Sequence, residues 1–150
     1  MSEPRSKPKT EPVHILFLCV ANSARSQLAE GLAKSLFGDK AEIHSAGSVP
    51  SGKVQPWAIE VLEEEGVDIS RNWSKSFEQL PPNFLATLDY VITLCAEEVC
   101  PTMVSKAARL HWPIPDPAAA TESDKADAFR SAKAMIRLRL QEFGKEHGLV

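Results

Sequence analysis

Short apolar runs alternate along the chain with stretches whose apolar residues recur at helical spacing. The run from Val13 to Leu18 is unbroken, as expected for a strand that is buried on both faces of a sheet. From Arg25 to Phe37 the apolar positions repeat about every four residues, and Gly38 follows where a helix would end. This part of the chain is therefore predicted to form a strand, a short polar loop and a helix.

The remaining elements repeat this order. We expect strands at Ala41 to Ala46, Tyr90 to Leu94 and Arg109 to Trp112, and helices at Pro56 to Glu65 and Ser123 to Phe143. One face of the last helix carries Phe129, Ala132, Ile136, Leu140 and Phe143, and Ser123 is expected to cap it. Residues 73 to 88 are expected to be loop with short helical turns. The alternation predicts an α/β fold whose parallel sheet is covered on both faces.

Size and charge narrow the range of functions. The 150 residues are 43% apolar, which suits one domain, and a net charge of -3 gives no general attraction to polyanions. No apolar run is long enough to span a bilayer. We therefore expect a cytoplasmic monomer with no nucleic acid or membrane partner. Residues 1–12 are rich in Pro, Lys, Ser and Glu and are predicted to be a flexible tail before the domain at 13–150.

A cysteine loop follows the first predicted strand. It fits C-x5-R-S and reads Cys19, Val20, Ala21, Asn22, Ser23, Ala24, Arg25 and Ser26. At a helix N-terminus the Cys19 thiolate is favoured by the helix dipole, and Ser26 can donate a hydrogen bond to it. The backbone N–H groups from Val20 to Arg25 can surround a tetrahedral oxyanion while the Arg25 guanidinium binds two of its oxygens. Either residue alone would more often be structural, but together they predict a site for phosphate, arsenate or sulfate.

A second candidate lies in the proline-rich stretch after the last predicted strand, His111-Trp112-Pro113-Ile114-Pro115-Asp116-Pro117. The prolines restrict the position of Asp116. Attack by Cys19 on arsenic or phosphorus expels a poor leaving group, which a nearby carboxylic acid can protonate. Asp-Pro is often only turn chemistry, but with the cysteine loop present Asp116 is the candidate general acid.

The segment VANSARSQLAEGLA resembles the active-site loop and first helix of low-molecular-weight protein tyrosine phosphatases and of the arsenate reductases related to them. The similarity extends from about Val13 to the final helix. It implies a doubly wound four-stranded sheet, the cysteine loop as oxyanion site and Asp116 as general acid. Family sequences often carry Gly before the Asn and a second Cys before the Arg, where this chain has Ala21 and Ala24.

Two further cysteines, Cys95 and Cys100, distinguish a reductase from a phosphatase. Phosphoester hydrolysis needs one nucleophilic thiol, whereas reduction of arsenate to arsenite consumes two electrons that further thiols must supply. We expect Cys19 to attack arsenate, Cys95 to attack the Cys19 sulfur with release of arsenite, and Cys100 to attack Cys95. The alternative is that Cys95 is a buried strand-end residue and Cys100 is incidental.

The cysteine pair and the DPAAA run resemble the thioredoxin-coupled arsenate reductases. That resemblance implies thioredoxin as reductant, no tightly bound cofactor, and phosphate or sulfate as competing anions. The short spacing of the pair also leaves glutaredoxin with glutathione open. Two other functions compete: a low-molecular-weight phosphatase that hydrolyses phosphomonoesters through a phosphocysteine, and a redox sensor or arsenic-binding module without catalysis.

No histidine spacing in the chain indicates a metal site. In some reductases of the family a potassium ion lies behind the active-site loop, at positions that match Asn22, Glu30 and Ser45 here. The position of a further acidic ligand matches Lys75, whose ammonium would occupy the place of the ion and pair with Glu30. We therefore expect weak or absent potassium dependence; the alternative is that Glu30 and Lys75 are solvated surface charges.

Overall fold

The computed structural model describes residues 11–96 and 105–150, and its four strands form one parallel sheet in the order β2-β1-β3-β4. The strands are β1 (Val13–Cys19), β2 (Ala41–Gly47), β3 (Tyr90–Thr93) and β4 (Ala108–His111). The predicted four-stranded parallel sheet is confirmed. The direction of winding reverses between β1 and β3, which is where doubly wound sheets bind their ligands.

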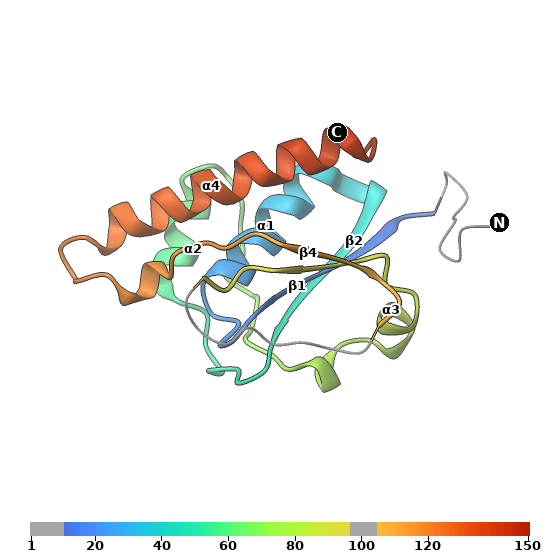
Figure 1. Ribbon diagram of the computed structural model, residues 1–150. Coiled ribbons are helices and arrows are strands. Elements are labelled where there is room, and N and C mark those ends of the chain that lie inside the picture. The colour runs from blue at the N-terminus through green and yellow to red at the C-terminus, as the bar shows by residue number, and fades with distance from the viewer. Residues whose placement is uncertain (1–10, 97–104) are drawn as a thin grey trace.

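Helices cover both faces of this sheet (Figure 1). The α-helices are α1 (Arg25–Phe37), α2 (Pro56–Glu63), α3 (Pro82–Ala86) and α4 (Lys125–Glu146). Short 3-10 helices are η1 (Gly38–Lys40), η2 (Phe77–Gln79) and η3 (Pro117–Ala119). α1, α2 and α4 lie on one side and α3 lies on the other, so the chain forms three layers.

The central strand β1 shows why its sequence is apolar without a break. Ile15 and Phe17 join the core beneath α1 and α4, whereas Leu16 and Leu18 join a second core on the α3 side. All four are fully buried. A strand that is covered on both faces loses the alternation of polar and apolar residues seen in half-exposed strands.

Three predicted helix ends differ from the structure, and one of them is the end of the last helix, which continues past Phe143 to Glu146. The last helix begins at Lys125, and Ser123 does not cap it: the N-cap residue is Asp124, without a side-chain cap, and the Ser123 hydroxyl contacts Thr121. The second helix ends at Glu63, and Gly66 follows with a positive φ of 78°. The predicted apolar face of α4 is buried as expected.

The strand register gathers the candidate residues at one edge of the sheet. Cys19 pairs with Gly47 at the ends of β1 and β2, and Thr93 pairs with His111 at the ends of β3 and β4. Because all strands are parallel, their carboxyl ends meet at this edge. None of the helices in the described ranges is both long enough and apolar enough to cross a bilayer.

Candidate active site

The loop between β1 and α1 is held by two neighbouring segments, the connection from β2 to α2 and the stretch before η2. The Val20 carbonyl accepts from the Val49 N–H at 2.9 Å, and the Ser23 carbonyl accepts from the Gln55 N–H at 2.8 Å. The Ala21 carbonyl accepts from the Ser74 hydroxyl at 2.8 Å. These contacts fix the curve of the loop around the position that the sequence assigns to an oxyanion.

Asn22 supplies the backbone conformation on which this loop depends. Its φ of 50° is the one positive value at a non-glycine position among the described residues. Asn tolerates this region better than most residues. The glycine that family sequences often carry at position 21 is therefore not required for a left-handed turn here, because the turn is made at Asn22 and not at Ala21.

Cys19 is buried at the end of β1, and its sulfur lies 2.8 Å from the Ser26 hydroxyl oxygen. The Asn22 side-chain amide donates to the same Ser26 oxygen at 2.7 Å. Because the Ser26 oxygen accepts from Asn22, its own proton can be directed at the Cys19 sulfur. This arrangement points a hydroxyl donor at the sulfur of the candidate nucleophile, in the loop that leads into the N-terminus of α1.

Arg25 connects the cysteine loop to two other strand ends. Its guanidinium is buried and donates to the Ile114 carbonyl at 2.9 Å and to the Leu94 carbonyl at 3.4 Å. Leu94 precedes Cys95, and Ile114 lies two residues before Asp116. One cation therefore ties together the segments that carry the nucleophile, the second thiol and the candidate acid.

Asp116 is exposed and forms the N-cap of η3, where its Oδ1 accepts from the Ala118 N–H at 3.0 Å. Ile114, just before it, anchors the loop through its N–H, which donates to the Leu94 carbonyl at 3.1 Å. The backbone around Asp116 is thus fixed relative to the end of β3.

The second thiol of the expected relay lies directly after β3. Cys95 is buried with 1% exposure and is disulfide-bonded, whereas Cys19 is a free thiol. The Leu94 N–H donates to the Leu18 carbonyl at 3.0 Å, so the residues before Cys19 and Cys95 are adjacent across the sheet. Cys100 lies outside the described residues.

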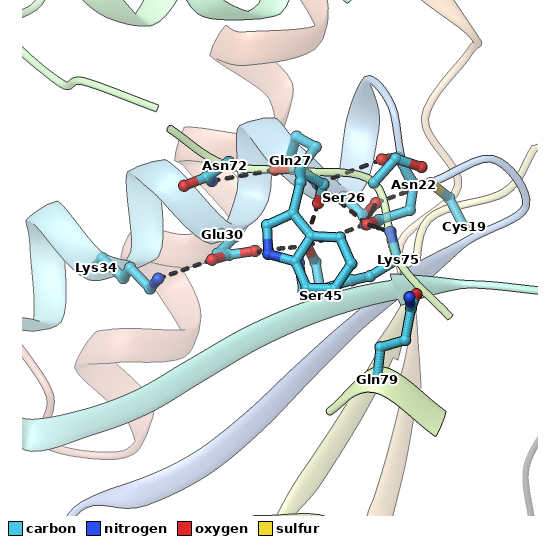
Figure 2. A network of polar contacts seen from close by, with 12 residues as sticks. Cys19, Asn22, Ser26, Gln27, Glu30, Lys34, Ser45, Asn72, Lys75 and Gln79 are labelled. Carbon is cyan, nitrogen blue, oxygen red and sulfur yellow. Dashed lines mark hydrogen bonds and ion pairs between the residues drawn. The ribbon is translucent and has the colours of Figure 1, made fainter. Parts of the chain in front are cut away.

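Behind the loop, a chain of polar contacts runs from Cys19 to a buried ion pair (Figure 2). Asn22 donates to Ser45 at 3.0 Å, and Ser45 donates to the Glu30 carboxylate at 2.5 Å. The Lys75 ammonium lies 3.6 Å from Glu30 and 3.4 Å from the Ser45 oxygen. Glu30 and Lys75 are both buried, so they are not a pair of solvated surface charges.

The charges of this pair depend on each other. Burial disfavours the Glu30 carboxylate, but the Lys75 charge and the contacts with Lys34 and Ser45 outweigh it, so the pKa of Glu30 lies below its ordinary value. Burial lowers the pKa of Lys75, and attraction to Glu30 limits the decrease. Removing Glu30 would leave the desolvated Lys75 charge without its counter-charge, whereas Glu30 would keep Lys34 if Lys75 were removed.

Sequence reasoning missed several residues that shape the loop from behind. Gln27 and Asn72 form a partly buried amide contact, the Ser74 hydroxyl donates to the Ala21 carbonyl, and Gly47 lies against the Val20 carbonyl. Gln27 carried one usable signal, since a polar residue in the first turn of a buried helix must find partners inside the protein. The segment around Asn72 carried none, because it lacks periodicity.

Gly47 allows the end of β2 to approach the cysteine loop. A Cβ atom at this position would lie 2.3 Å from the Val20 carbonyl oxygen, which is backbone and cannot rotate away. Gly47→Ala should therefore displace the loop and lower the free energy of unfolding by about 1–3 kcal/mol. Gly52→Ala is not a matched control because φ there is positive. Ser48→Ala, beside Gly47, is the better control, and urea unfolding of both variants measures the difference.

Among the described residues no group of three or more His, Cys, Asp or Glu side chains is placed to hold a metal ion. His111 contacts Thr93 at 2.7 Å, and His14 contacts Thr87 at 2.7 Å. Both imidazoles therefore have structural partners away from the cysteine loop.

Comparison with known proteins places this geometry in a family. A model of the low molecular weight phosphotyrosine protein phosphatase family matches residues 14–147. The chain belongs to this family. The match begins in β1 and ends just after α4, so it includes the cysteine loop, the ends of β3 and β4, and the Asp116-Pro117 pair of this chain.

Curated proteins similar to this chain include arsenate reductases. The chain is 40% identical over 135 residues to one from Halalkalibacterium halodurans, which covers 87% of this chain and 94% of that protein. It is 39% identical to one from Bacillus subtilis with the same coverage. A thioredoxin-dependent arsenate reductase structure from Corynebacterium glutamicum matches with a TM-score of 0.69 and 32% identity, over 90% of this chain and 62% of that one.

Proposed function

We propose that this protein reduces arsenate to arsenite with Cys19 as the nucleophile. The observation that carries the proposal is the Arg25 guanidinium, which links the loop of the Cys19 thiol to the carbonyl before Cys95. A phosphatase has no use for a second thiol at that strand end. Identity of about 40% to arsenate reductases over most of the chain supports the same chemistry.

Arsenate would bind in the loop from Val20 to Arg25. Its negative charge would be met by backbone N–H groups, by the positive end of α1 and by the Arg25 guanidinium. A solved arsenate reductase in a phosphate-binding state matches this chain with a TM-score of 0.70 and 29% identity, covering 88% of this chain and 96% of that one. Phosphate and sulfate should therefore compete with arsenate.

The relay we propose conserves atoms and electrons. The Cys19 thiolate attacks arsenic, an As–O bond breaks, and Asp116 protonates the departing oxygen as water. Cys95 then attacks the Cys19 sulfur, and the electron pair of the S–As bond stays on arsenic, which leaves as arsenite. Cys100 attacks Cys95, which frees Cys19 and leaves a Cys95–Cys100 disulfide. The free Cys19 and the disulfide-bonded Cys95 of the structure are compatible with this last state.

Thioredoxin is the reductant that we propose for the final disulfide. A disulfide between Cys95 and Cys100 would be a substrate for a dithiol protein, which returns two electrons by thiol–disulfide exchange. The similarity to a thioredoxin-dependent arsenate reductase supports this choice. Glutaredoxin with glutathione remains the second candidate.

We also propose that Lys75 replaces the potassium ion that the family resemblance implies behind the loop. The Lys75 ammonium lies between Glu30, Ser45 and the Trp73 carbonyl, which are the oxygens that a cation would use. A potassium ion does not fit beside this ammonium, because both would need the same oxygens. No step of the relay depends on a metal ion.

Coupled turnover tests this function. With thioredoxin, its reductase and NADPH, the protein should oxidise NADPH only when arsenate is present. Cys95→Ser and Cys100→Ser should each abolish multiple turnover, because the disulfide that thioredoxin reduces can no longer form. Any hydrolysis of p-nitrophenyl phosphate should survive in both variants, since that chemistry needs Cys19 alone. Efficient phosphatase activity without arsenate reduction by either reductant would instead make the protein a phosphatase.

A further inference from the structure

Gln27 is fully buried in the first turn of α1 and joins the cysteine loop to the segment before η2. Its Nε2 donates to the Asn22 carbonyl at 3.2 Å, to the Asn22 Oδ1 at 3.0 Å and to the Trp73 carbonyl at 3.1 Å. Its Oε1 accepts from the Asn72 side-chain amide at 3.0 Å. The Gln27 side chain therefore holds both the backbone and the side chain of Asn22.

Asn22 needs such support for two reasons. Its left-handed backbone, with φ of 50°, is a conformation that residues other than glycine adopt with the help of local hydrogen bonds. Its side chain must also be oriented correctly, because an amide that is turned over exchanges its oxygen and nitrogen. Gln27 contributes to both, through the carbonyl and through the Oδ1 of the same residue.

The orientation of Asn22 decides where the Ser26 proton goes. The Asn22 Oδ1 accepts from Gln27 and from the Lys75 N–H at 2.9 Å, so the Nδ2 is left to donate to Ser26. If the Asn22 amide were rotated by 180°, its N–H groups would face the two donors, Gln27 and the Lys75 N–H, and its oxygen would face Ser26. Ser26 would then donate to Asn22 and no longer to the Cys19 sulfur.

We propose that Gln27 is a positioning residue for the Cys19 nucleophile, acting through Asn22 and Ser26 without touching the substrate. The idea rests on Cys19 being the reactive thiol of the proposed function. It assigns a reason for a glutamine at this position: glutamine has a donor for Asn22 and an acceptor for Asn72 at the two ends of one planar amide. Neither methionine nor glutamate supplies both.

The test measures Cys19 directly. Reduced full-length protein is alkylated with iodoacetamide across a range of pH, and modification of Cys19 is followed by mass spectrometry of its peptide. Gln27→Met keeps the length of the side chain and removes its hydrogen bonds. We expect alkylation at neutral pH to slow by roughly 5-fold, with the pH dependence moved to higher pH, because a net hydrogen bond contributes about 1 kcal/mol. Asn72→Ala should give a smaller effect of the same sign.

Two comparisons separate positioning from a general loss of structure. Gln141→Met, at an exposed position of α4, should leave alkylation unchanged. The Ser26→Ala variant lacks the hydroxyl through which Asn22 acts on Cys19. Adding Gln27→Met to it should therefore change alkylation little. Unchanged alkylation in Gln27→Met, or an equal decrease with and without Ser26, would overturn the proposal. If Gln27→Met does not fold, Asn72→Ala with and without Ser26→Ala gives the same decision.

The alkylation assay contains no arsenate, so it is independent of the reductase assay. Loss of arsenate reduction in the unmodified protein would contradict the proposed function and leave the Gln27 result standing. If instead the unmodified protein reduces arsenate normally and Gln27→Met leaves alkylation unaffected, only the proposed role of Gln27 is contradicted.

Discussion

Cys19→Ser is expected to lower arsenate reduction and any phosphatase activity together, each by on the order of 10³-fold or more. Serine has nearly the size of cysteine, and Cys19 is buried beside Ser26, so the variant should fold. Its hydroxyl is a far weaker nucleophile than a thiolate, and it cannot form a disulfide with Cys95. Steady-state rates with thioredoxin and with p-nitrophenyl phosphate measure both losses.

A binding measurement makes this prediction specific to the nucleophile. The oxyanion would be held by the loop N–H groups and Arg25, which the substitution leaves in place, so Cys19→Ser should still bind arsenate in a calorimetric titration. Arg25→Lys provides the contrast: it keeps the charge but cannot make the bidentate contact, and it should weaken binding. Turnover retained in Cys19→Ser would rule out the mechanism.

Glu30→Gln is expected to be the most destabilising of the polar substitutions, by about 3–5 kcal/mol at pH 7, because it leaves the buried Lys75 ammonium unpaired. Combining it with Lys75→Met should recover much of this loss. Lys34→Ala removes the other partner of Glu30, whose side chain is half exposed, and should cost under about 1 kcal/mol. Urea unfolding of these three variants and of the wild type measures each difference.

The same pair gives a pH dependence of known sign. The pKa of Glu30 is lower in the folded protein than its ordinary value of 4.5, so the unfolded chain takes up this proton first as the pH falls. The stabilisation from Glu30 is complete above about pH 4.5 and is lost as the pH falls through the folded pKa. The gap between wild type and Glu30→Gln should therefore narrow in acid; a gap that stays constant down to pH 3 would contradict the assigned pairing.

The proposed role of Lys75 can also be tested by measuring arsenate turnover in sodium and in potassium salts. If the ammonium serves in place of the ion, arsenate turnover should be equal in the two salts at the same ionic strength. Activation that is specific to potassium would show that the ion has a place that Lys75 does not fill.

The strands and the long helices could be predicted because their causes are local. β1 is apolar throughout since both its faces are covered, and α1 ends at Phe37, just before Gly38, which has a positive φ of 56°. The start of α4 was harder to predict. Ser123 and Asp124 are both good N-cap residues, and the choice between them depends on the turn that Thr121 forms with Asp124.

The candidate site was predictable where chemistry requires particular residue types in sequence, as with Cys19, Arg25 and Ser26. The residues behind the loop could not be found in this way. Gln27 and Asn72 are separated by 45 residues, and only the folded chain brings their amides together. The burial of Lys75 next to Glu30 is likewise a consequence of tertiary structure, because a lysine near η2 is ordinarily solvated.

A single-turnover measurement tests the three-thiol relay most directly. Fully reduced protein, freed of all external reductant, is mixed with arsenate, and the arsenite formed is counted against the protein. The relay predicts about one arsenite per chain, with Cys95 and Cys100 found in a disulfide, because the chain itself holds the two electrons required. No arsenite before glutathione or glutaredoxin is added would contradict the relay.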